Sequence, residues 1–214
     1  MTSIDIISDP ICPWCYIGKT RFEAALARRP DHGLTISWKP FQLNPTMPEE
    51  GMDRREYLER KFGGPQGAQQ VYSDIVKTAE SNGLFIDIDR IKRTPNTINA
   101  HRLIHWAEAE GVQNAVVAAL FIAYFQEGKD ISDLETLADI GEKAGMDRAA
   151  LARLLASDAD KDATRREDEK ARQMGVQGVP TFLIDGQYVV TGARDTAFWV
   201  DLIDEISALK ATAE

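Results

Sequence analysis

The sequence predicts an α/β protein in which a βαβ unit and a later ββα unit form one domain, interrupted by a large all-helical insertion. Three patterns carry this prediction. An isoleucine-rich run leads directly into a C-x-x-C motif, a long middle stretch has helical apolar spacing, and two β-rich runs flank an Asp-Gly turn near the C-terminus. We expect an α/β domain made of residues 1–45 and 160–214, with a helical domain over residues 46–159.

The N-terminal unit begins with a short buried strand. Residues 3–8 are rich in isoleucine, and Asp9-Pro10 ends the run. Apolar side chains then recur near helical spacing from residue 13 to about residue 29, and residues 34–41 alternate as in a strand. A parallel pair of strands needs a helical crossover of this length, so we expect a parallel βαβ unit.

The middle of the chain reads as helices separated by glycines. An alternating-sign charge run, Asp158 to Arg172, follows and is expected to be a solvated helix face. Two β-rich runs around Asp185-Gly186 then predict a hairpin, and an amphipathic helix ends the chain. The helices of the insertion are expected at residues 53–62, 66–82, 96–110, 112–127, 133–144 and 147–157.

Composition excludes some classes of function. The net charge of −9 over 214 residues argues against a nucleic-acid partner, because phosphate binding needs clustered Lys and Arg. No stretch approaches the ~20 apolar residues that cross a bilayer, and the first residues lack a basic, apolar signal segment. We expect a cytoplasmic protein without a membrane or metal partner, either a monomer or a homodimer.

Cys12 and Cys15 are the only two cysteines and are the candidate catalytic residues. On a first helical turn, side chains at this spacing lie about 5–6 Å apart, within the range a disulfide tolerates. Pro13 suits the first position of a helix, which would place Cys12 at the N-cap against unpaired backbone N–H groups. A thiolate is favoured at such a position. A reducing compartment would keep the two cysteines as free thiols when they are not reacting, which favours a catalytic over a structural role. The pair therefore predicts thiol-disulfide chemistry.

Two other interpretations of the cysteines remain. A structural bridge across so short a loop would stabilise the fold only weakly. A zinc site would pair the cysteines with His101 and His105, but their separation in sequence is unlike that of zinc fingers. Packing of these histidines on a helix face is the simpler expectation.

The order of motifs resembles the thioredoxin superfamily. Cys12-Pro13-Trp14-Cys15 after the first strand and Gly178-Val179-Pro180-Thr181-Phe182 before the hairpin carry this resemblance, and the long helical insertion resembles the DsbA branch. Within that branch, residues 8–15 and the segment Thr94-Pro95-Asn96-Thr97-Ile98-Asn99-Ala100-His101-Arg102 are similar to the FrnE-like group. The resemblance covers essentially the whole chain and implies a thioredoxin-like fold.

The resemblance also implies roles for individual residues. Cys12 would be the exposed attacking thiol and Cys15 the buried resolving thiol. A cis Val179-Pro180 bond would lie against the pair and leave the Val179 backbone to bind an extended client. Trp14 would be exposed for client contact, with a core position as the alternative. For Pro180, the alternative is an ordinary turn proline that enters a strand. Many relatives carry a buried acid on the first strand where this chain has Ile6, flanked by Asp5 and Asp9.

The principal rival is a glutathione-dependent isomerase or transferase of the kappa type, including 2-hydroxychromene-2-carboxylate isomerases. These enzymes resemble the chain in fold and in the 96–102 segment, but they typically have Ser where Cys12 stands. Asn96, Asn99, His101 and Arg102 would then line a groove for a small molecule, with a helix N-cap as the alternative for Asn96. A third interpretation is a chaperone module that does not use its cysteines. We expect a disulfide oxidoreductase or isomerase acting on client proteins or small thiols and disulfides, with no bound cofactor and with glutathione as a candidate redox partner.

Overall fold

A four-stranded sheet organises the computed structural model, which describes residues 2–211. The strand order is β2-β1-β5-β6, with β1 paired in parallel to β2 and antiparallel to β5. The strands are β1 (Thr2–Ser8), β2 (Leu34–Pro40), β5 (Thr181–Ile184) and β6 (Tyr188–Thr191), with a separate two-stranded ribbon of β3 (Met52–Asp53) and β4 (Arg93–Thr94). The predicted parallel βαβ unit and the late hairpin are both confirmed.

Helices surround the sheet and form the middle of the chain. Each helix that the sequence predicts is present, with ends that differ by a few residues. They are α1 (Pro13–Arg28), α2 (Arg54–Phe62), α3 (Pro65–Glu80), the 3₁₀ helix η1 (Ile88–Arg90), α4 (Ile98–Ala109), α5 (Gln113–Phe125), α6 (Leu134–Lys143), α7 (Arg148–Leu155), α8 (Lys161–Gln173) and α9 (Thr196–Ala211). The α/β fold with a large helical insertion is thus confirmed, with the β3-β4 ribbon as an addition.

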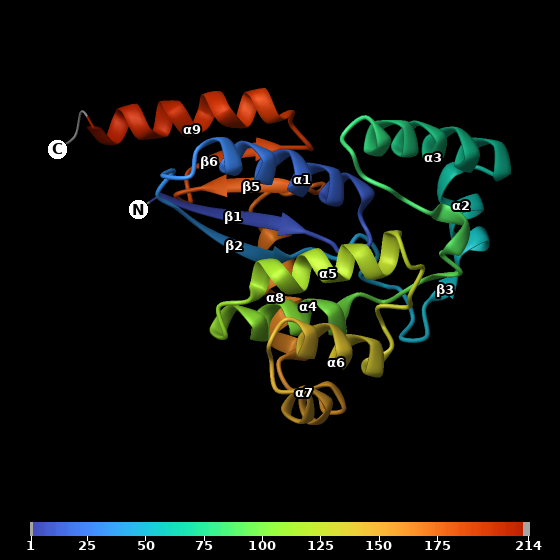
Figure 1. The fold of residues 1–214 in the computed structure, drawn as a ribbon. Helices are drawn as coiled ribbons and strands as arrows, with labels where there is room; N and C mark the ends of the chain where they lie inside the picture. The colour runs from blue at the N-terminus through green and yellow to red at the C-terminus, as the bar shows by residue number, and fades with distance from the viewer. Residues whose placement is uncertain (1, 212–214) are drawn as a thin grey trace.

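The sheet has a different helical layer on each face (Figure 1). Helices α1 and α9 pack side by side on one face, and α4, α5 and α8 contact β2 from the other side. On the first face Phe22, Phe182 and Trp199 form an aromatic cluster with ring centroids 4.4–5.6 Å apart. Burying each such side chain contributes about 1.5–3 kcal/mol, so this cluster holds the α1–sheet–α9 sandwich together.

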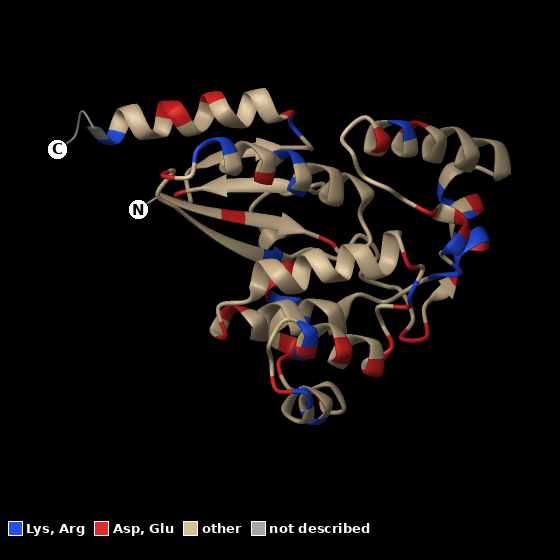
Figure 2. Ribbon diagram, viewed as in Figure 1, with Lys and Arg blue, Asp and Glu red and all other residues tan. Residues whose placement is uncertain are grey.

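The apolar core continues from the sheet into the insertion through α5, which is uncharged along its whole length (Figure 2). An all-round apolar helix is stable only when other elements cover it. Phe121 and Phe125 of α5 stack on Tyr16 of α1, with centroids 5.0 and 5.8 Å from the Tyr16 ring. This contact joins the helical insertion to the helix that begins at Cys12.

Several helices of the insertion begin at an aspartate that caps them. The side chains of Asp53, Asp133 and Asp147 accept hydrogen bonds from backbone N–H groups three residues later. Such caps are worth about 1 kcal/mol each. The acidic residues at these positions therefore define where α2, α6 and α7 begin.

Candidate active site

The topology brings two loops together at one end of the sheet. Strand β1 runs toward Cys12, strand β5 runs away from Pro180, and the two strands pair with Ile7 opposite Thr181. Because the pair is antiparallel, the loop after β1 and the loop before β5 lie at the same end of the sheet. Residues 167 positions apart in sequence become neighbours, as the hydrogen bond from Cys12 to Val179 shows.

Cys12 is the N-cap of α1, as the sequence predicts. Its backbone is extended, with φ −87° and ψ 114°, and Pro13 occupies the first turn. The carbonyl of Cys12 accepts hydrogen bonds from the N–H groups of Cys15 and Tyr16, at 3.1 and 3.3 Å. The Cys12 thiol thus lies at the start of the helix, near the positive end of its dipole.

Both cysteines are free thiols and both are buried. Cys15 is 1% exposed, as expected for one helical turn into the core, but Cys12 is only 4% exposed. The expectation of an exposed attacking thiol is therefore wrong for this conformation. The reason is the opposite loop, whose Val179 carbonyl lies 3.5 Å from Cys12 Sγ and accepts its hydrogen bond. Trp14 is 40% exposed at the same helix start, as expected.

The peptide bond between Val179 and Pro180 is cis, as the resemblance implied. A Cβ added to Gly18 of α1 would lie 3.0 Å from Pro180 Cγ, so the absence of a side chain at Gly18 lets α1 approach this loop closely. On the other side of the proline, Thr181 Oγ1 donates to the Gly178 carbonyl at 2.8 Å. The loop is thereby held against the start of α1.

The environment of Cys15 differs from that of Cys12. Burial raises the pKa of the Cys15 thiol well above its usual value, and the neighbouring Cys12 adds to the rise. Hydrogen bonds from the Ser8 side chain and the Asp9 backbone act in the opposite direction on this pKa. A buried thiol with a raised pKa stays protonated until a nearby group takes its proton.

Asp9, whose orientation the sequence leaves open, is completely buried. Its carboxyl group accepts hydrogen bonds from Leu43 N–H at 2.7 Å and from Ile11 N–H at 3.4 Å. Burial nevertheless dominates and raises the pKa of Asp9 to about 7. His101 Nε2 lies 3.8 Å from Asp9 Oδ1, and burial lowers the pKa of His101 to about 4. Ile6 belongs to the apolar core, so Asp9 is the buried acid at this end of β1.

Asp168 is a second buried carboxylate that the sequence did not reveal. Its Oδ1 accepts the Gln42 N–H at 2.8 Å and pairs with Arg172, which stacks over the Phe41 ring at 4.1 Å. The alternating charges of the 158–172 run were interpreted as a solvated helix face, and at Asp168 that interpretation is wrong. The physical reason is that the 41–43 segment crosses α8 there and needs partners for its backbone groups.

The 96–102 segment is engaged in internal hydrogen bonds. Asn96 accepts from Ile98 N–H at 3.0 Å, although Thr97 is the N-cap of α4. Asn99 accepts from the guanidinium of Arg102 at 2.8 Å. The same guanidinium donates to the carbonyls of Leu154, Ser157 and Ala159 at 2.6–2.9 Å, which cap the end of α7.

The structure thus divides the predicted binding residues into two groups. Pro13 and Trp14 follow Cys12 at the start of α1, and Val179, which precedes Pro180 on the opposite loop, contacts Cys12 Sγ. Asn96 and Arg102 hydrogen-bond to neighbouring segments, Asn99 accepts a hydrogen bond from Arg102 on the same helix, and His101 lies against Asp9.

Two further observations concern residues 2–211 only. They contain no cluster of three or more His, Cys, Asp or Glu side chains arranged to hold a metal ion. No helix among these residues has the length and apolar character to cross a membrane.

Comparison with known proteins identifies the family. The profile of the DsbA-like thioredoxin domain matches residues 3–204, almost the entire chain. The chain therefore belongs to the DsbA-like thioredoxin family, which confirms the resemblance in the sequence.

Solved structures agree with this assignment. A probable DsbA oxidoreductase from Streptomyces coelicolor is 30% identical, with a TM-score of 0.86 over 96% of this chain and 89% of the other. A 2-hydroxychromene-2-carboxylate isomerase is 23% identical, with a TM-score of 0.73 over 99% of both chains. The cytosolic disulfide reductase DsbM from Pseudomonas aeruginosa is 21% identical, with a TM-score of 0.65 over 99% and 98%. The last two similarities show the shared fold alone.

Proposed function

We propose that this protein is a thiol-disulfide oxidoreductase that exchanges disulfides through Cys12 and Cys15. One observation carries the proposal: Cys12 Sγ lies at the N-terminus of α1, 3.5 Å from the carbonyl that precedes cis-Pro180, with Cys15 one turn further along. A thiolate is the nucleophile in disulfide exchange, and Cys12 is the cysteine at the helix terminus. Cys15 is close enough to complete the exchange within the protein.

In the reductive direction, the Cys12 thiolate attacks one sulfur of a client disulfide. A bond forms between Cys12 and that sulfur, the client S–S bond breaks, and the second client sulfur leaves as a thiolate. Cys15 then loses its proton and attacks Cys12 Sγ, which releases the first client sulfur and closes the 12–15 disulfide. Two molecules of a small thiol such as glutathione would restore the dithiol and leave as their disulfide. The oxidative direction is the reverse of these steps.

Trp14, Pro13, Val179 and Pro180 form the proposed contact surface for the client. Trp14 offers exposed aromatic area beside the thiol. The Val179 carbonyl accepts a hydrogen bond from the Cys12 thiol in the free protein. A client backbone that bonds to this carbonyl would therefore compete with Cys12. We infer that the client replaces this contact as it binds, which uncovers Cys12 at the moment of attack.

Glutathione and a reducing compartment are part of the same proposal. The DsbM protein, which has this fold, has been solved with glutathione and is described as cytosolic. By analogy we propose glutathione as the small-thiol co-reactant and the cytoplasm as the site of action. A reducing compartment keeps Cys12 and Cys15 as free thiols, which is the state needed to reduce a client disulfide.

The test compares wild type with Cys12→Ser and Cys15→Ser in the glutathione-driven reduction of a small disulfide and of disulfide-bonded insulin or scrambled ribonuclease. We expect Cys12→Ser to abolish exchange. We expect Cys15→Ser to accumulate a mixed disulfide with the client, visible by mass spectrometry. Full turnover by Cys12→Ser would refute the proposal. Glutathione-dependent isomerase activity in that variant would instead favour the kappa-type alternative, which typically has Ser at this position.

A further inference from the structure

Helix α2 carries four cationic side chains, and two of them are paired with acids (Figure 2). Arg55 and Arg60 each bond to a glutamate one turn away on the same helix. Among residues 2–211, the other two cations, Arg54 and Lys61, have no acidic partner in an ion pair. Both lie over the ring of Tyr57, at 5.9 and 5.2 Å from its centroid. The unpaired positive charge of α2 is therefore gathered around one tyrosine.

Arg54 is a buried cation, with 5% of its surface exposed. Its guanidinium donates to the hydroxyl groups of Thr94 and Tyr72 and lies 5.8 Å from the centroid of the Tyr124 ring. Burial raises the pKa of Tyr72 and of Tyr124, so both phenols stay neutral. The Nε atom of Arg54 is buried and has no hydrogen-bond partner. A buried charge is costly without an opposite charge, so this guanidinium is suited to binding an anion.

A second donor without an acceptor belongs to the same cluster. Lys61 donates to the Tyr57 oxygen at 2.7 Å, and the Tyr57 hydroxyl donates to Asn44 Oδ1 at 3.0 Å. The amide oxygen of Asn44 is thus occupied, whereas its Nδ2 atom is buried and has no partner. A guanidinium and an amide with unused N–H groups match a carboxylate, which accepts hydrogen bonds through two oxygens.

Two sets of contacts connect this cluster to Cys12. Asn44 follows Leu43, whose N–H group donates to the carboxyl group of Asp9 at 2.7 Å. The carbonyl of Asp9 in turn accepts the N–H group of Cys12 at 2.9 Å. On the arginine side, burial is the main cause of the raised pKa of Tyr72, and the charge of Cys12 adds to it. The unused donors therefore lie within electrostatic range of the reacting thiol.

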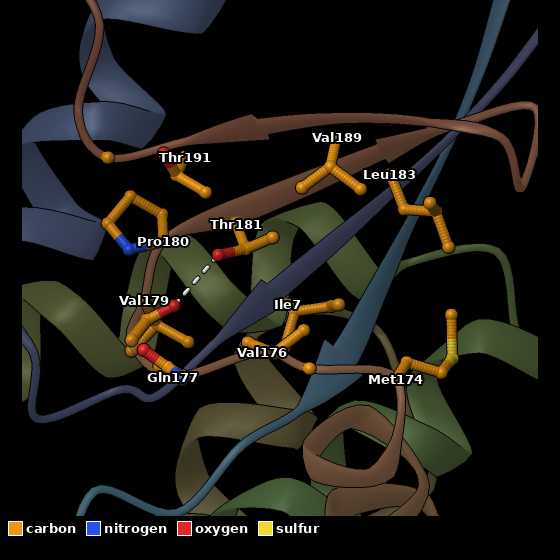
Figure 3. A pocket seen from close by; sticks show the side chains of 13 residues that line it. Ile7, Met174, Val176, Gln177, Val179, Pro180, Thr181, Leu183, Val189 and Thr191 are labelled. Atoms are coloured by element: carbon orange, nitrogen blue, oxygen red, sulfur yellow. Dashed lines mark hydrogen bonds between the residues drawn. The ribbon is translucent and has the colours of Figure 1, made fainter.

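The surface beside Val179 and Pro180 has a different character. A groove of about 560 Å³ lies there, lined by residues of β5, β6 and the 174–180 loop (Figure 3). None of its 13 lining residues is charged, so an anion there would lose hydration without gaining a partner. The net charge of −9 also disfavours anions at long range. A preference for an anionic substrate would therefore have to come from the cluster around Arg54.

We propose that Arg54 and Asn44 bind the carboxylate of a small disulfide while its sulfur reacts at Cys12. The inference rests on the proposed disulfide exchange and specifies a substrate class: low-molecular-weight disulfides with a carboxylate close to the sulfur. In the reaction, Cys12 bonds to one substrate sulfur, the substrate S–S bond breaks, and Cys15 then displaces that sulfur. The dithiol is oxidised to the 12–15 disulfide, and the substrate is reduced to two thiols that take up the two protons.

The test measures how fast three disulfides oxidise the reduced protein in a single turnover, which needs no further reductant. 3,3′-Dithiodipropionate carries two carboxylates, its dimethyl ester carries none, and cystamine carries two ammonium groups. Labelling with N-ethylmaleimide and mass spectrometry count the remaining thiols. Each rate is divided by the rate of the same disulfide with 2-mercaptoethanol, which removes differences in intrinsic reactivity. We expect wild type to prefer dithiodipropionate over the other two by about tenfold or more.

Arg54→Met should bring the ratio of the dithiodipropionate and dimethyl ester rates close to one, and Asn44→Ala should lower this ratio by about threefold or more. Arg55→Met is the matched control, because it removes the same charge from the adjacent, highly exposed position of α2. It should keep the wild-type ratio. A loss by the same factor for all three disulfides in Arg54→Met would overturn the inference, because the arginine would then act on the thiol and not on the carboxylate.

A second measurement does not depend on folding of a variant. With wild-type protein, suberate, a dicarboxylate of the same chain length without sulfur, should compete with dithiodipropionate, and dimethyl suberate should not. Equal normalised rates for the three disulfides, or equal inhibition by suberate and its ester, would overturn the inference. If neither these disulfides nor disulfide-bonded insulin oxidises the wild-type dithiol, the proposed function itself fails.

Discussion

His101 Nε2 lies 3.8 Å from Asp9 Oδ1, and both side chains are almost completely inaccessible to solvent. The pKa of Asp9 is raised from 3.8 to about 7 and that of His101 is lowered from 6.5 to about 4, in each case mainly by burial. Between about pH 4 and 6.5, the carboxyl group of Asp9 and the imidazole of His101 are therefore both neutral in the folded protein. In the unfolded chain, both would be charged.

These shifts have opposite effects on stability. The Asp9 contribution is fully present below about pH 4 and is lost as the pH rises to about 7, because the folded state keeps a proton that the unfolded chain releases. The His101 contribution is present above about pH 6.5 and is lost as the pH falls toward 4. The two slopes oppose each other, so we expect them largely to cancel in wild type between about pH 4.5 and 6.

Single substitutions should separate the two slopes. In His101→Gln, the free energy of unfolding should fall by on the order of 3 kcal/mol as the pH rises from about 4 to 7. In Asp9→Asn, it should rise by roughly 2–3 kcal/mol between about pH 4 and 6.5. Asp168, whose charge raises the pKa of His101, is retained in both variants. Urea denaturation at several pH values checks this, and parallel profiles for both variants would contradict it.

Gly18→Ala tests the close approach of α1 to the cis-proline loop. The added methyl group would lie 3.0 Å from Pro180 Cγ and 3.5 Å from Ala193, so the loop must move by a few tenths of an ångström. We expect exchange rates to fall about threefold to tenfold, because Val179 and Cys12 lose their alignment. Stability should change little, since alanine gains about 0.5–1 kcal/mol over glycine within a helix. Gly178→Ala, with no atom within 4 Å of its Cβ, is the control and should keep wild-type rates for small disulfides.

Arg102→Met tests whether this arginine is structural. Its loss would leave the carbonyls of Leu154, Ser157 and Ala159, which are partly buried, without their donor and would leave the buried position of the guanidinium unfilled. We expect the free energy of unfolding to fall by on the order of 3–5 kcal/mol, with unchanged KM in the folded protein. Arg55→Met, at a highly exposed arginine, should change stability by less than about 0.5 kcal/mol. A raised KM at unchanged stability would instead assign Arg102 to substrate binding.

Trp14→Ala tests the exposed aromatic beside the thiol. Because Trp14 is 40% exposed, its removal should cost less than about 1 kcal/mol of stability. The kcat/KM for an unfolded protein client should fall severalfold, whereas that for glutathione disulfide should stay within about twofold, since contact area matters for large substrates. Steady-state kinetics with both substrates is the measurement. An equal loss for both would indicate that Trp14 acts on the thiol itself.

The sequence predicts the elements well because their signals are local. Helix starts depend on caps such as Asp133, strands on isoleucine and valine runs, and the hairpin on Asp185-Gly186. The N-cap position of Cys12 follows from Pro13 next to it. The pairing of this helix start with Val179, 167 residues away, came from the resemblance to a family, because no local pattern encodes it.

Burial is what the sequence could not predict. Asp168 and Arg165 are both charged residues of one alternating run, and the sequence does not distinguish their burial. In the structure, Asp168 bonds to the 41–43 segment and is buried, whereas Arg165 is exposed. The sequence suggests Arg102 as a substrate-binding residue, but in the structure its guanidinium donates to a carbonyl at the end of α7.

By itself, the sequence determined the order of strands and helices, the paired cysteines at a helix start and the class of chemistry they suit. Only the tertiary structure decided that Val179 covers Cys12, that Asp9 and His101 share a dry interior, and that an uncharged groove lies beside the loop of Val179 and Pro180. The physical reason is that helix and strand propensities act over a few residues, whereas desolvation depends on which distant segments pack together.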